Sequence, residues 1–281
     1  MPEVSVVLPC FNAGEYLPRA LESVREQTLD DVEIIIVDDG STDPGTIAYL
    51  DGLPGDVRLV RQANRGLPGA RNAGIEAAAG TYVTTLDCDD WLEPDFLEKT
   101  LAALVADPQA GFAFAHLALE GDASGVLAKN YNFFEQLFLN QLPYCLMMRK
   151  DVWEDAGGYD TTMRHGYEDW EFNIRLGGTW RFGVVVPEPL FHYRVREDGM
   201  LRSLSSSLHG QLWSDIQQRN RALYRLPALI GTWRRWRTYP SSYPLALYFA
   251  WAALHRLLPD AAFAALFRRL LSFSQSRRGR G

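Results

Sequence analysis

Short apolar runs alternate with helical patterns over the first hundred residues, and this alternation is the strongest restriction on the fold. Four runs predict strands, at residues 4–8, 32–37, 57–60 and 82–86. Residues 16–27 carry apolar side chains on one helical face and residues 67–79 are rich in alanine, so both predict helices. Strands that alternate with helices form mostly parallel sheets with helices on both faces. The chain is therefore predicted to be an α/β protein of Rossmann-like type.

The rest of the chain divides into a mixed section and a helical section. Further apolar runs predict strands at residues 111–117, 144–148 and 182–186. A helix is expected to begin near Glu168, and from residue 211 onward the pattern is helical and increasingly apolar. We therefore expect one α/β unit over residues 1–210 and a basic, helical C-terminal extension over residues 211–281.

Charge is distributed unevenly between these two parts. The net charge is −7, but residues 219–281 hold twelve arginines and one acid, which gives this segment +11 and leaves the first 218 residues with −18. An acidic main body repels phosphate backbones, so no nucleic-acid partner is expected. A small anionic ligand carried with a metal ion is compatible with such a body.

Cysteine usage and hydropathy indicate the compartment. Cys10, Cys88 and Cys145 are odd in number and form no C-x-x-C motif, which predicts neither a disulfide framework nor a zinc site. The chain shows no run of ~18 apolar residues and no secretory signal pattern. We expect a protein of the reducing cytoplasm without a membrane span.

An acidic cluster directly after the fourth predicted strand is the sharpest chemical signal. Asp87, Asp89 and Asp90 place three carboxylates in four positions, and these repel one another unless a cation or solvent neutralises them. Asp87 and Asp89 can face the same way because side chains alternate along extended backbone. Carboxylates with open water positions suit Mg²⁺ or Mn²⁺, which in turn bind substrate phosphates. A solvated acidic turn is the alternative.

Polar residues also follow the first two predicted strands and open a predicted helix. Asn12 follows the first strand, and Asp38 and Asp39 begin the DDGSTD segment after the second. Ligands of parallel sheets bind at the carboxyl ends of the strands, where these residues fall. Arg71 lies near the start of a predicted helix, where both the guanidinium and the helix end favour anions. A strand-to-helix loop and a surface ion pair are the alternatives.

Two later segments carry further candidates. Glu168 and Asp169 open a predicted helix, where acids either complement the helix dipole or point into a cleft. Adjacent helix positions diverge by about 100°, so at most one of these two does the latter. After the predicted strand 182–186, His192 is either a metal ligand or a packed histidine. Tyr193 and Arg194 are candidates to close over a diphosphate.

Two common nucleotide-binding motifs are missing. A dehydrogenase needs G-x-G-x-x-G after its first strand, where this chain has Pro9-Cys10-Phe11-Asn12. A kinase or ATPase P-loop needs a Gly-Lys pair, and the chain contains none. Both classes are therefore disfavoured.

The ordered set of motifs resembles the inverting family 2 glycosyltransferases, which have the GT-A fold. Each piece alone is a weak signal, but the set runs in family order over about residues 3–205 and is highly specific. The matching pieces are SVVLPCFN, IIIVDDGSTD, NRGLPGARNAG, LDCDDWLEP, RKDVWEDAGGYD, GYEDWEF and HYRVREDGM. The motifs do not cover the tail after about residue 211.

This resemblance implies transfer of a sugar from a nucleotide-sugar, commonly a UDP-sugar, to a hydroxyl of a saccharide or lipid-linked acceptor. It implies a nucleotide-binding half over about residues 1–110 and an acceptor-binding half over about 111–210. Asp169 is implied as the catalytic base. Asp87 and Asp89 match the DxD motif that holds Mn²⁺ or Mg²⁺, with His192 as a further candidate ligand. The residues expected around the nucleotide are Pro9, Phe11, Asn12, Asp39, Arg71 and Asp87. Those expected at the acceptor or lid are Glu168, Trp170, Tyr193 and Arg194.

This chain departs from the family pattern in two places. Phe11 stands where tyrosine is common, which keeps a ring for stacking and loses a hydroxyl. Arg196 and Gly199 replace a histidine and a serine that often follow the Tyr-Arg pair. The second departure bears on lid contacts and on the ligand role of His192.

Two other functions stay open. Sugar-phosphate nucleotidyltransferases have a similar sheet, but they carry a glycine-rich loop after the first strand that this chain lacks. A catalytically silent GT-A binding module would keep the fold without turnover, and the intact acidic motifs disfavour it.

The C-terminal extension carries a separate hypothesis. Residues 245–254 are apolar but too short to span ~30 Å of hydrocarbon. Residues 260–273 place Phe263 and Leu266 on one apolar helical stripe, and arginines flank both segments. An apolar face with basic flanks predicts peripheral binding to an anionic membrane, at the inner face of the cell membrane. Packing on the catalytic domain, or a homodimer interface, is the alternative.

Overall fold

The computed structural model describes residues 2–179, 181–196 and 208–259, together with 262, 263, 265, 266 and 269. Nine strands within these residues form one sheet: β1 (Val4–Cys10), β2 (Val32–Asp38), β3 (Val57–Arg61), β4 (Tyr82–Thr85), β5 (Trp91–Leu92), β6 (Ala110–Gly121), β7 (Gly125–Leu127), β8 (Met147–Arg149) and β9 (Phe182–Val195). The helices are α1 (Leu17–Arg25), α2 (Pro44–Asp51), α3 (Gly66–Ala77), α4 (Phe96–Ala106), α5 (Phe133–Gln136), α6 (Lys150–Asp155), α7 (Glu168–Gly178), α8 (His209–Arg219), α9 (Leu226–Trp236) and α10 (Leu245–Leu257).

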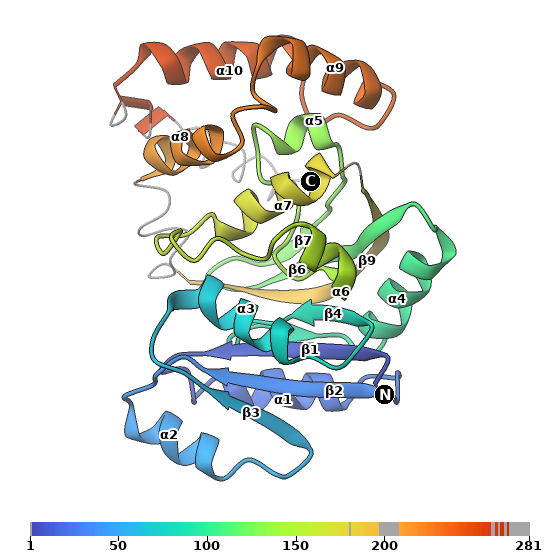
Figure 1. Ribbon diagram of the computed structural model, residues 1–281, viewed down its shortest axis with the longest axis vertical. Coiled ribbons are helices and arrows are strands. Elements are labelled where there is room, and N and C mark those ends of the chain that lie inside the picture. Colours follow the sequence, from blue (N-terminus) through green and yellow to red (C-terminus); the bar gives the residue numbers. More distant parts are fainter. Residues whose placement is uncertain are drawn as a thin grey trace.

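The strand order shows a parallel half joined to a mixed half (Figure 1). The order is β3-β2-β1-β4-β8-β6-β9-β5, with β7 paired to β6. Strands β1 to β4 pair in parallel, β8 runs antiparallel between β4 and β6, and β9 pairs in parallel with β6. The predicted α/β fold is therefore confirmed, and the parallel ladders carry most of the paired residues.

Both faces of the parallel strands are buried, because their side chains alternate between two apolar clusters. Val6 and Leu8 of β1 belong to the cluster that α1 and α4 cover, whereas Val7 faces the other cluster, with Ile75 of α3. Gly74 lets α3 approach the sheet closely, since an added Cβ would lie 2.2 Å from Cγ1 of Val7. This packing sets the position of the neighbouring residues of α3.

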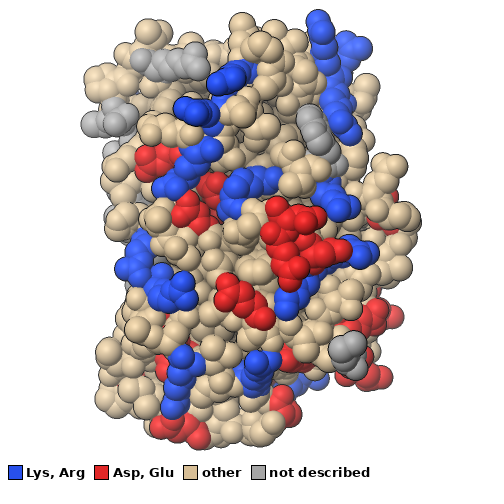
Figure 2. All heavy atoms as spheres, in the orientation of Figure 1, with Lys and Arg blue, Asp and Glu red and all other residues tan. Residues whose placement is uncertain are grey.

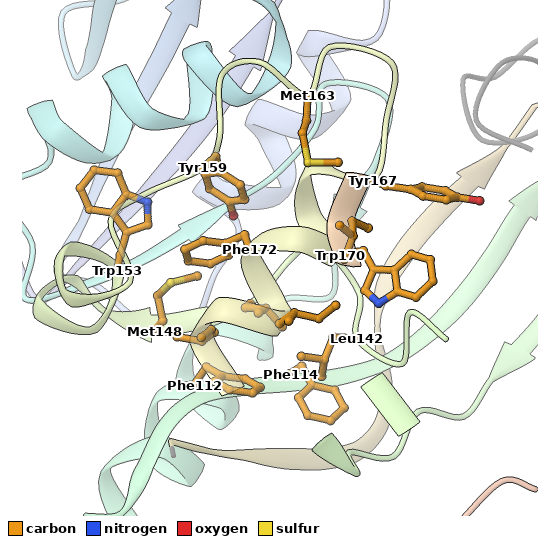
Figure 3. Close-up of a cluster of buried hydrophobic side chains, with 14 of the residues drawn as sticks. Phe112, Phe114, Leu142, Met148, Trp153, Tyr159, Met163, Tyr167, Trp170 and Phe172 are labelled. Carbon is orange, nitrogen blue, oxygen red and sulfur yellow. The ribbon is translucent and has the colours of Figure 1, made fainter. Parts of the chain in front are cut away.

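The second cluster continues under α7 and fixes its position (Figure 3). Phe112 and Phe114 of β6 lie beneath Trp170 and Phe172 of α7, and Tyr159 packs on Phe172 with ring centroids 4.4 Å apart. The start of α7 is thereby held over the sheet.

Some elements differ from the predictions. α4 was not predicted as a helix. α2 follows the DDGSTD segment, and Asp43 of that segment caps it by accepting from the Thr46 amide at 2.7 Å. The last strand was expected to end at Val186, but β9 continues to Val195. His192, Tyr193 and Arg194 therefore lie in a strand that pairs with β5 and β6, and not in a loop after it.

The C-terminal helices pack on the α5 and α7 side of the molecule (Figure 1). Trp213 of α8, Trp236 of α9 and Tyr248 of α10 are buried there. Phe263 is also buried against Trp213, so it does not contribute to an exposed apolar stripe as expected. Most of the predicted stripe, including Phe267, Leu270 and Leu271, lies outside the described residues. Among the described helices, none has the length and hydrophobicity needed to cross a membrane.

Candidate active site

The carboxyl ends of β1, β2 and β4 meet at one edge of the sheet because these strands are parallel. A pocket of about 350 Å³ opens at this edge. It is lined by Pro9, Phe11, Asn12, Ala13, Glu15, Tyr16, Leu67, Asp87, Cys88, Asp89 and Arg196. Five of the predicted site residues thus line one pocket: Pro9, Phe11, Asn12, Asp87 and Asp89. Phe11 is 49% exposed, which leaves its ring available to a planar ligand.

Asn12 ties the loop after β1 to the loop after β2. It has a positive φ of 52°, and its Oδ1 accepts from the backbone amides of Thr42 and Asp43 at 2.7 and 2.9 Å. The backbone amide of Asn12 donates to Oγ of Ser41 at 3.1 Å. The side chain of Asn12 is therefore engaged in loop structure at the border of the pocket.

Asp39 holds the loop that precedes α3. Oδ1 accepts from Nε2 of Gln62 at 2.6 Å and from the Arg65 amide at 2.8 Å, and Oδ2 accepts from the Gly66 amide at 2.8 Å. These bonds satisfy donors at the start of the helix. Asp39 is 3% exposed and is not among the residues that line the pocket. Its contact with a nucleotide stays a prediction.

A buried arginine joins the acidic cluster to the start of α7. Nη2 of Arg71 donates to both carboxylate oxygens of Asp87, at 2.9 and 3.0 Å, and Nη1 donates to Oε1 of Glu168 at 2.8 Å. The guanidinium also lies over the ring of Tyr144, 4.8 Å from its centroid. Arg71 is 1% exposed and is not among the residues that line the pocket, so its contact with a nucleotide stays a prediction.

Glu168 faces inward in this arrangement. Its pKa is raised to about 7, chiefly by burial and also by the charges of Asp169 and Asp87, whereas the charge of Arg71 lowers it. Trp170 is likewise buried, and its Nε1 donates to the Gln136 carbonyl at 2.6 Å. Glu168 thus bridges to Arg71 and Trp170 packs in the interior, and their contact with an acceptor stays a prediction.

Asp169 is half-buried, unlike its two neighbours in α7. Nδ2 of Asn140 donates to its Oδ2 at 2.9 Å, and Gln136 in turn donates to Asn140 at 3.1 Å. The residue before α7, Tyr167, has the left-handed conformation with φ 64°, which is uncommon for a residue with a Cβ and fixes how the helix starts. An oriented carboxylate that keeps lone pairs open can accept a proton.

Asp90 is a structural member of the acidic cluster. It accepts from the hydroxyl of Tyr144 and, through Oδ1, from the Arg194 amide at 2.7 Å, while Nε of Arg194 donates to the Asp89 carbonyl at 3.0 Å. Burial raises the pKa of Asp90 well above its usual range, as do the charges of Asp89 and Asp87. Arg194 therefore fastens β9 to the acidic loop.

The carboxylates of Asp87 and Asp89 are chemically suited to hold a divalent cation that also binds phosphate. Burial raises the pKa of the Asp89 carboxyl, and the neighbouring charge of Asp87 raises it too, a repulsion that a cation would relieve. Both line the same pocket and offer oxygen ligands. Among the described residues, no group of three or more His, Cys, Asp and Glu side chains could hold a metal. The two aspartates therefore fit an ion that takes its other ligands from phosphate and water.

His192 has other partners. Its Nε2 is 2.6 Å from Oε1 of Glu93, its Nδ1 is 3.3 Å from Oε1 of Glu120, and its ring stacks on Trp91 at 4.9 Å. Both ring nitrogens thus face glutamates outside the Asp87–Asp89 pair, and a ligand role for His192 stays a prediction. Tyr193, by contrast, is half-buried near the acidic cluster: burial raises its pKa, and so do the charges of Asp90, Asp87 and Asp89.

Tyr144 and Asn140 were missed as site residues. Tyr144 belongs to an apolar run, and a buried tyrosine hydroxyl needs a hydrogen-bond partner. The sequence could therefore have predicted that its hydroxyl contacts a polar residue. Asn140 stands in an Asn-Gln pair between apolar segments and carries no signal in the sequence that would connect it to Asp169, 29 positions away.

The parallel half of the sheet carries one acidic pair, Asp87 and Asp89, at its carboxyl edge. The mixed half supplies a second pair, Glu168 and Asp169. This arrangement is similar to that of the GT-A glycosyltransferases. The chain belongs to glycosyl transferase family 2, whose model matches residues 5–158. It is 30% identical over 226 residues to the putative glycosyltransferase EpsH of Bacillus subtilis, covering 74% of this chain and 65% of EpsH. The chain thus spans slightly less than two thirds of that relative.

Two solved structures have the same fold at low sequence identity. S. aureus TarS 1–349, in complex with UDP-GlcNAc, aligns with a TM-score of 0.62 at 19% identity, over 77% of this chain and 65% of that one. The mannosyltransferase PcManGT from Pyrobaculum calidifontis, in complex with GDP-Man and Mn²⁺, aligns with a TM-score of 0.60 at 19% identity, over 94% and 84%. The GT-A fold expected from the motifs is therefore confirmed.

Proposed function

We propose that this protein is an inverting glycosyltransferase that moves a sugar from a nucleotide-sugar, with a UDP-sugar as first candidate, to a hydroxyl of a saccharide or lipid-linked acceptor. Family membership supports this choice over a sugar-phosphate nucleotidyltransferase or a silent binding module. One observation carries the proposal: Arg71 bridges Asp87, at the pocket, to Glu168, at the start of α7. This bridge brings the proposed donor side and the proposed base together.

The donor is proposed to bind in the pocket at the sheet edge. The base of the nucleotide would stack on the exposed ring of Phe11, beside Pro9, with the diphosphate toward Asp87 and Asp89. In this proposal, about residues 1–110 would form the nucleotide-binding half and about residues 111–210 the acceptor-binding half. Asn12 and Asp39 would act indirectly, by holding the loops that border the pocket.

Asp89 and Asp87 would hold a Mn²⁺ or Mg²⁺ ion, as the donor set permits. When bound, such an ion neutralises negative charge on the departing diphosphate. A solved GT-A structure contains Mn²⁺ with its nucleotide-sugar, which is consistent with this role. Arg194 would contribute positive charge at the same place, since its Nε lies against the Asp89 backbone.

Asp169 is proposed as the general base. In an in-line displacement, the acceptor oxygen bonds to the anomeric carbon as the bond from that carbon to the diphosphate oxygen breaks, and the acceptor proton passes to Asp169. Asn140 holds the Asp169 carboxylate through Oδ2 and thus orients it. General-base catalysis of this kind contributes ~10²–10⁴-fold to a rate.

The test compares the two carboxylates of the α7 start. A panel of UDP-, GDP- and dTDP-sugars, screened by hydrolysis with Mn²⁺ and with EDTA, first identifies the donor. Asp169→Asn is then expected to lower turnover by ~10²–10⁴-fold while donor affinity stays near that of the unmodified protein. Glu168→Gln, the matched control, is expected to lose less activity. If the ranking is reversed, the base is Glu168 and the assignment is wrong; if no nucleotide-sugar is turned over, the proposed activity is wrong.

A further inference from the structure

Much of the outward face of α10 is apolar. Among the side chains of this helix whose exposure the structure describes, the exposed ones are Ala246, Leu247, Phe249, Ala250, Ala253 and Leu257. Leu247 is 50% exposed and Leu257 is 80% exposed. A helix that packs on a protein by one face normally carries charged or polar residues on the other. α10 therefore presents to solvent a face that soluble proteins usually cover.

The neighbouring helix α9 extends this face and adds positive charge. Leu226 and Ile230 are exposed, by 61% and 36%, and lie one turn apart. Arg234 follows one turn later, and Arg237 lies on the same side of the helix. Both helices run along the same end of the molecule, opposite α2 (Figure 1). Their outward faces, which we call the α9–α10 surface, thus combine apolar residues with arginines.

The charge of this region is of one sign. Residues 219–259 contain seven arginines and no aspartate or glutamate. On the face that the space-filling view shows, the described residues at the end that carries α9 and α10 are blue or uncharged, with no red ones among them (Figure 2). Tyr239 and Tyr243, between the two helices, are 42% and 39% exposed. Tyrosine rings of this kind suit a boundary between apolar and aqueous phases.

The inner side of the same layer is firmly attached. Glu135 of α5 accepts hydrogen bonds from the Ser241 hydroxyl and, at 2.7 Å, from the Ser242 amide. Nδ2 of Asn132 donates to the Trp236 carbonyl at 3.2 Å, and Tyr248 is buried against Phe134. The exposed apolar residues are therefore held in a fixed layer and do not result from a helix that lacks a packing site.

We propose that the α9–α10 surface binds the surface of an anionic lipid bilayer, with both helices lying in the interfacial plane. The apolar side chains of α10 would enter the acyl boundary, and Arg234 and Arg237 would pair with lipid phosphates. α10 has 13 residues, which is too few for a span and sufficient for a helix that lies flat. This inference does not depend on the proposed sugar transfer.

A second copy of this chain fits the surface less well. In a two-fold interface the same patch meets itself, so Arg234 and Arg237 of both copies would be drawn to one contact. Residues 219–259 offer no carboxylate to pair with them. An anionic bilayer supplies the opposite charge, and for this reason we favour the membrane.

The experiment is flotation of the full chain with vesicles. Equimolar phosphatidylcholine and phosphatidylglycerol vesicles are compared with pure phosphatidylcholine vesicles, at low and high salt. Binding is expected for the anionic vesicles and should weaken with salt. Leu247→Ser combined with Phe249→Ser should reduce the vesicle partition coefficient by at least about tenfold, because each removes apolar area that the bilayer would cover. Arg234→Glu combined with Arg237→Glu should reduce it similarly.

Val126→Ser is the matched control, since Val126 is 62% exposed on β7, outside the α9–α10 surface. It is expected to bind vesicles like the unmodified chain. Circular dichroism and thermal unfolding of each variant establish that a loss of binding is not a loss of fold. Equal binding to both vesicle types, or unchanged binding of the Leu247/Phe249 variant, overturns the proposal. Light scattering completes the test: a dimer that this variant converts to a monomer would show that the surface serves a second copy.

Discussion

Arg71 and Glu168 form an ion pair at 2.8 Å inside the protein, although 97 positions separate them in the chain. Arg71 is carried by α3 and Glu168 by the first turn of α7. The same guanidinium holds Asp87 with its other terminal nitrogen. One buried cation therefore connects the two halves of the proposed active site, and its removal should affect both folding and transfer.

Replacement of Arg71 tests this connection. Arg71→Ala leaves two carboxylates buried without their partner and is expected to lower the free energy of unfolding by about 3–5 kcal/mol. Arg71→Lys keeps the charge but cannot bond both carboxylates with a planar fork, so it should cost a smaller amount and still reduce transfer. Chemical denaturation measures both effects. Arg25→Lys, in an exposed pair with Asp56, should change the stability by at most about 1 kcal/mol.

A double-mutant cycle of Arg71→Ala and Glu168→Gln measures the coupling free energy between the two side chains. If the two residues act through each other, the double variant should be destabilised by less than the sum of the single ones. Strictly additive effects would contradict the bridge.

Asp89→Asn should separate catalysis from stability. The raised pKa of Asp89 shows that its charge is unfavourable in the folded protein without a ligand, so the variant should keep its melting temperature or gain slightly. Turnover should fall by at least ~10²-fold, and the gain in nucleotide affinity on adding Mn²⁺ should disappear. Calorimetric titration with and without the ion measures this. Asp56→Asn, an exposed aspartate, serves as the control, and near-normal turnover of Asp89→Asn would refute the metal assignment.

The raised pKa of Glu168 predicts a pH dependence of stability. The carboxyl titrates near pH 7 in the folded chain and at its ordinary, lower value in the unfolded chain. Between these values the folded state holds more protons, so the contribution of this group to the free energy of unfolding falls as pH rises from about 4.5 to 7. Glu168→Gln should remove this part of the slope in denaturation curves recorded across that range. An identical slope in both proteins would show that Glu168 does not titrate there.

Phe11→Ala should weaken nucleotide binding without affecting folding. Stacking of a base on an aromatic ring contributes ~1–3 kcal/mol, so the binding free energy of a nucleoside diphosphate should become less favourable by that amount. Phe11 is 49% exposed, and its loss should hardly change the melting temperature. Phe11→Tyr restores the ring and should bind like the unmodified chain. Unchanged affinity of Phe11→Ala would place the base elsewhere.

The sequence predicts the sheet edge well, because the signals there are local. Apolar runs such as Val4–Cys10 reflect burial on both faces, and the polar residues that follow them mark the ends of parallel strands. Asp87 and Asp89 accordingly line one pocket with Phe11, as their positions suggested.

Contacts between distant segments could not be predicted in the same way. The donors to Asp39 come from 23 to 27 residues further along the chain, and nothing in the DDGSTD segment identifies them. The expected end of the last strand was wrong because Pro187 and Pro189 interrupt the apolar run. β9 absorbs them at a register shift against β6, and the strand resumes at Phe191.

The hydrogen bonds of Asn12 and Asp39 have a consequence for the thermodynamics of recognition. Both side chains hold their loops through six hydrogen bonds to backbone amides and side chains. The conformational entropy of these loops is therefore lost during folding, so ordering them does not weaken the binding of the donor. Association at this edge should resemble the docking of a ligand onto a rigid surface, with a rate set by diffusion and orientation and not by loop ordering.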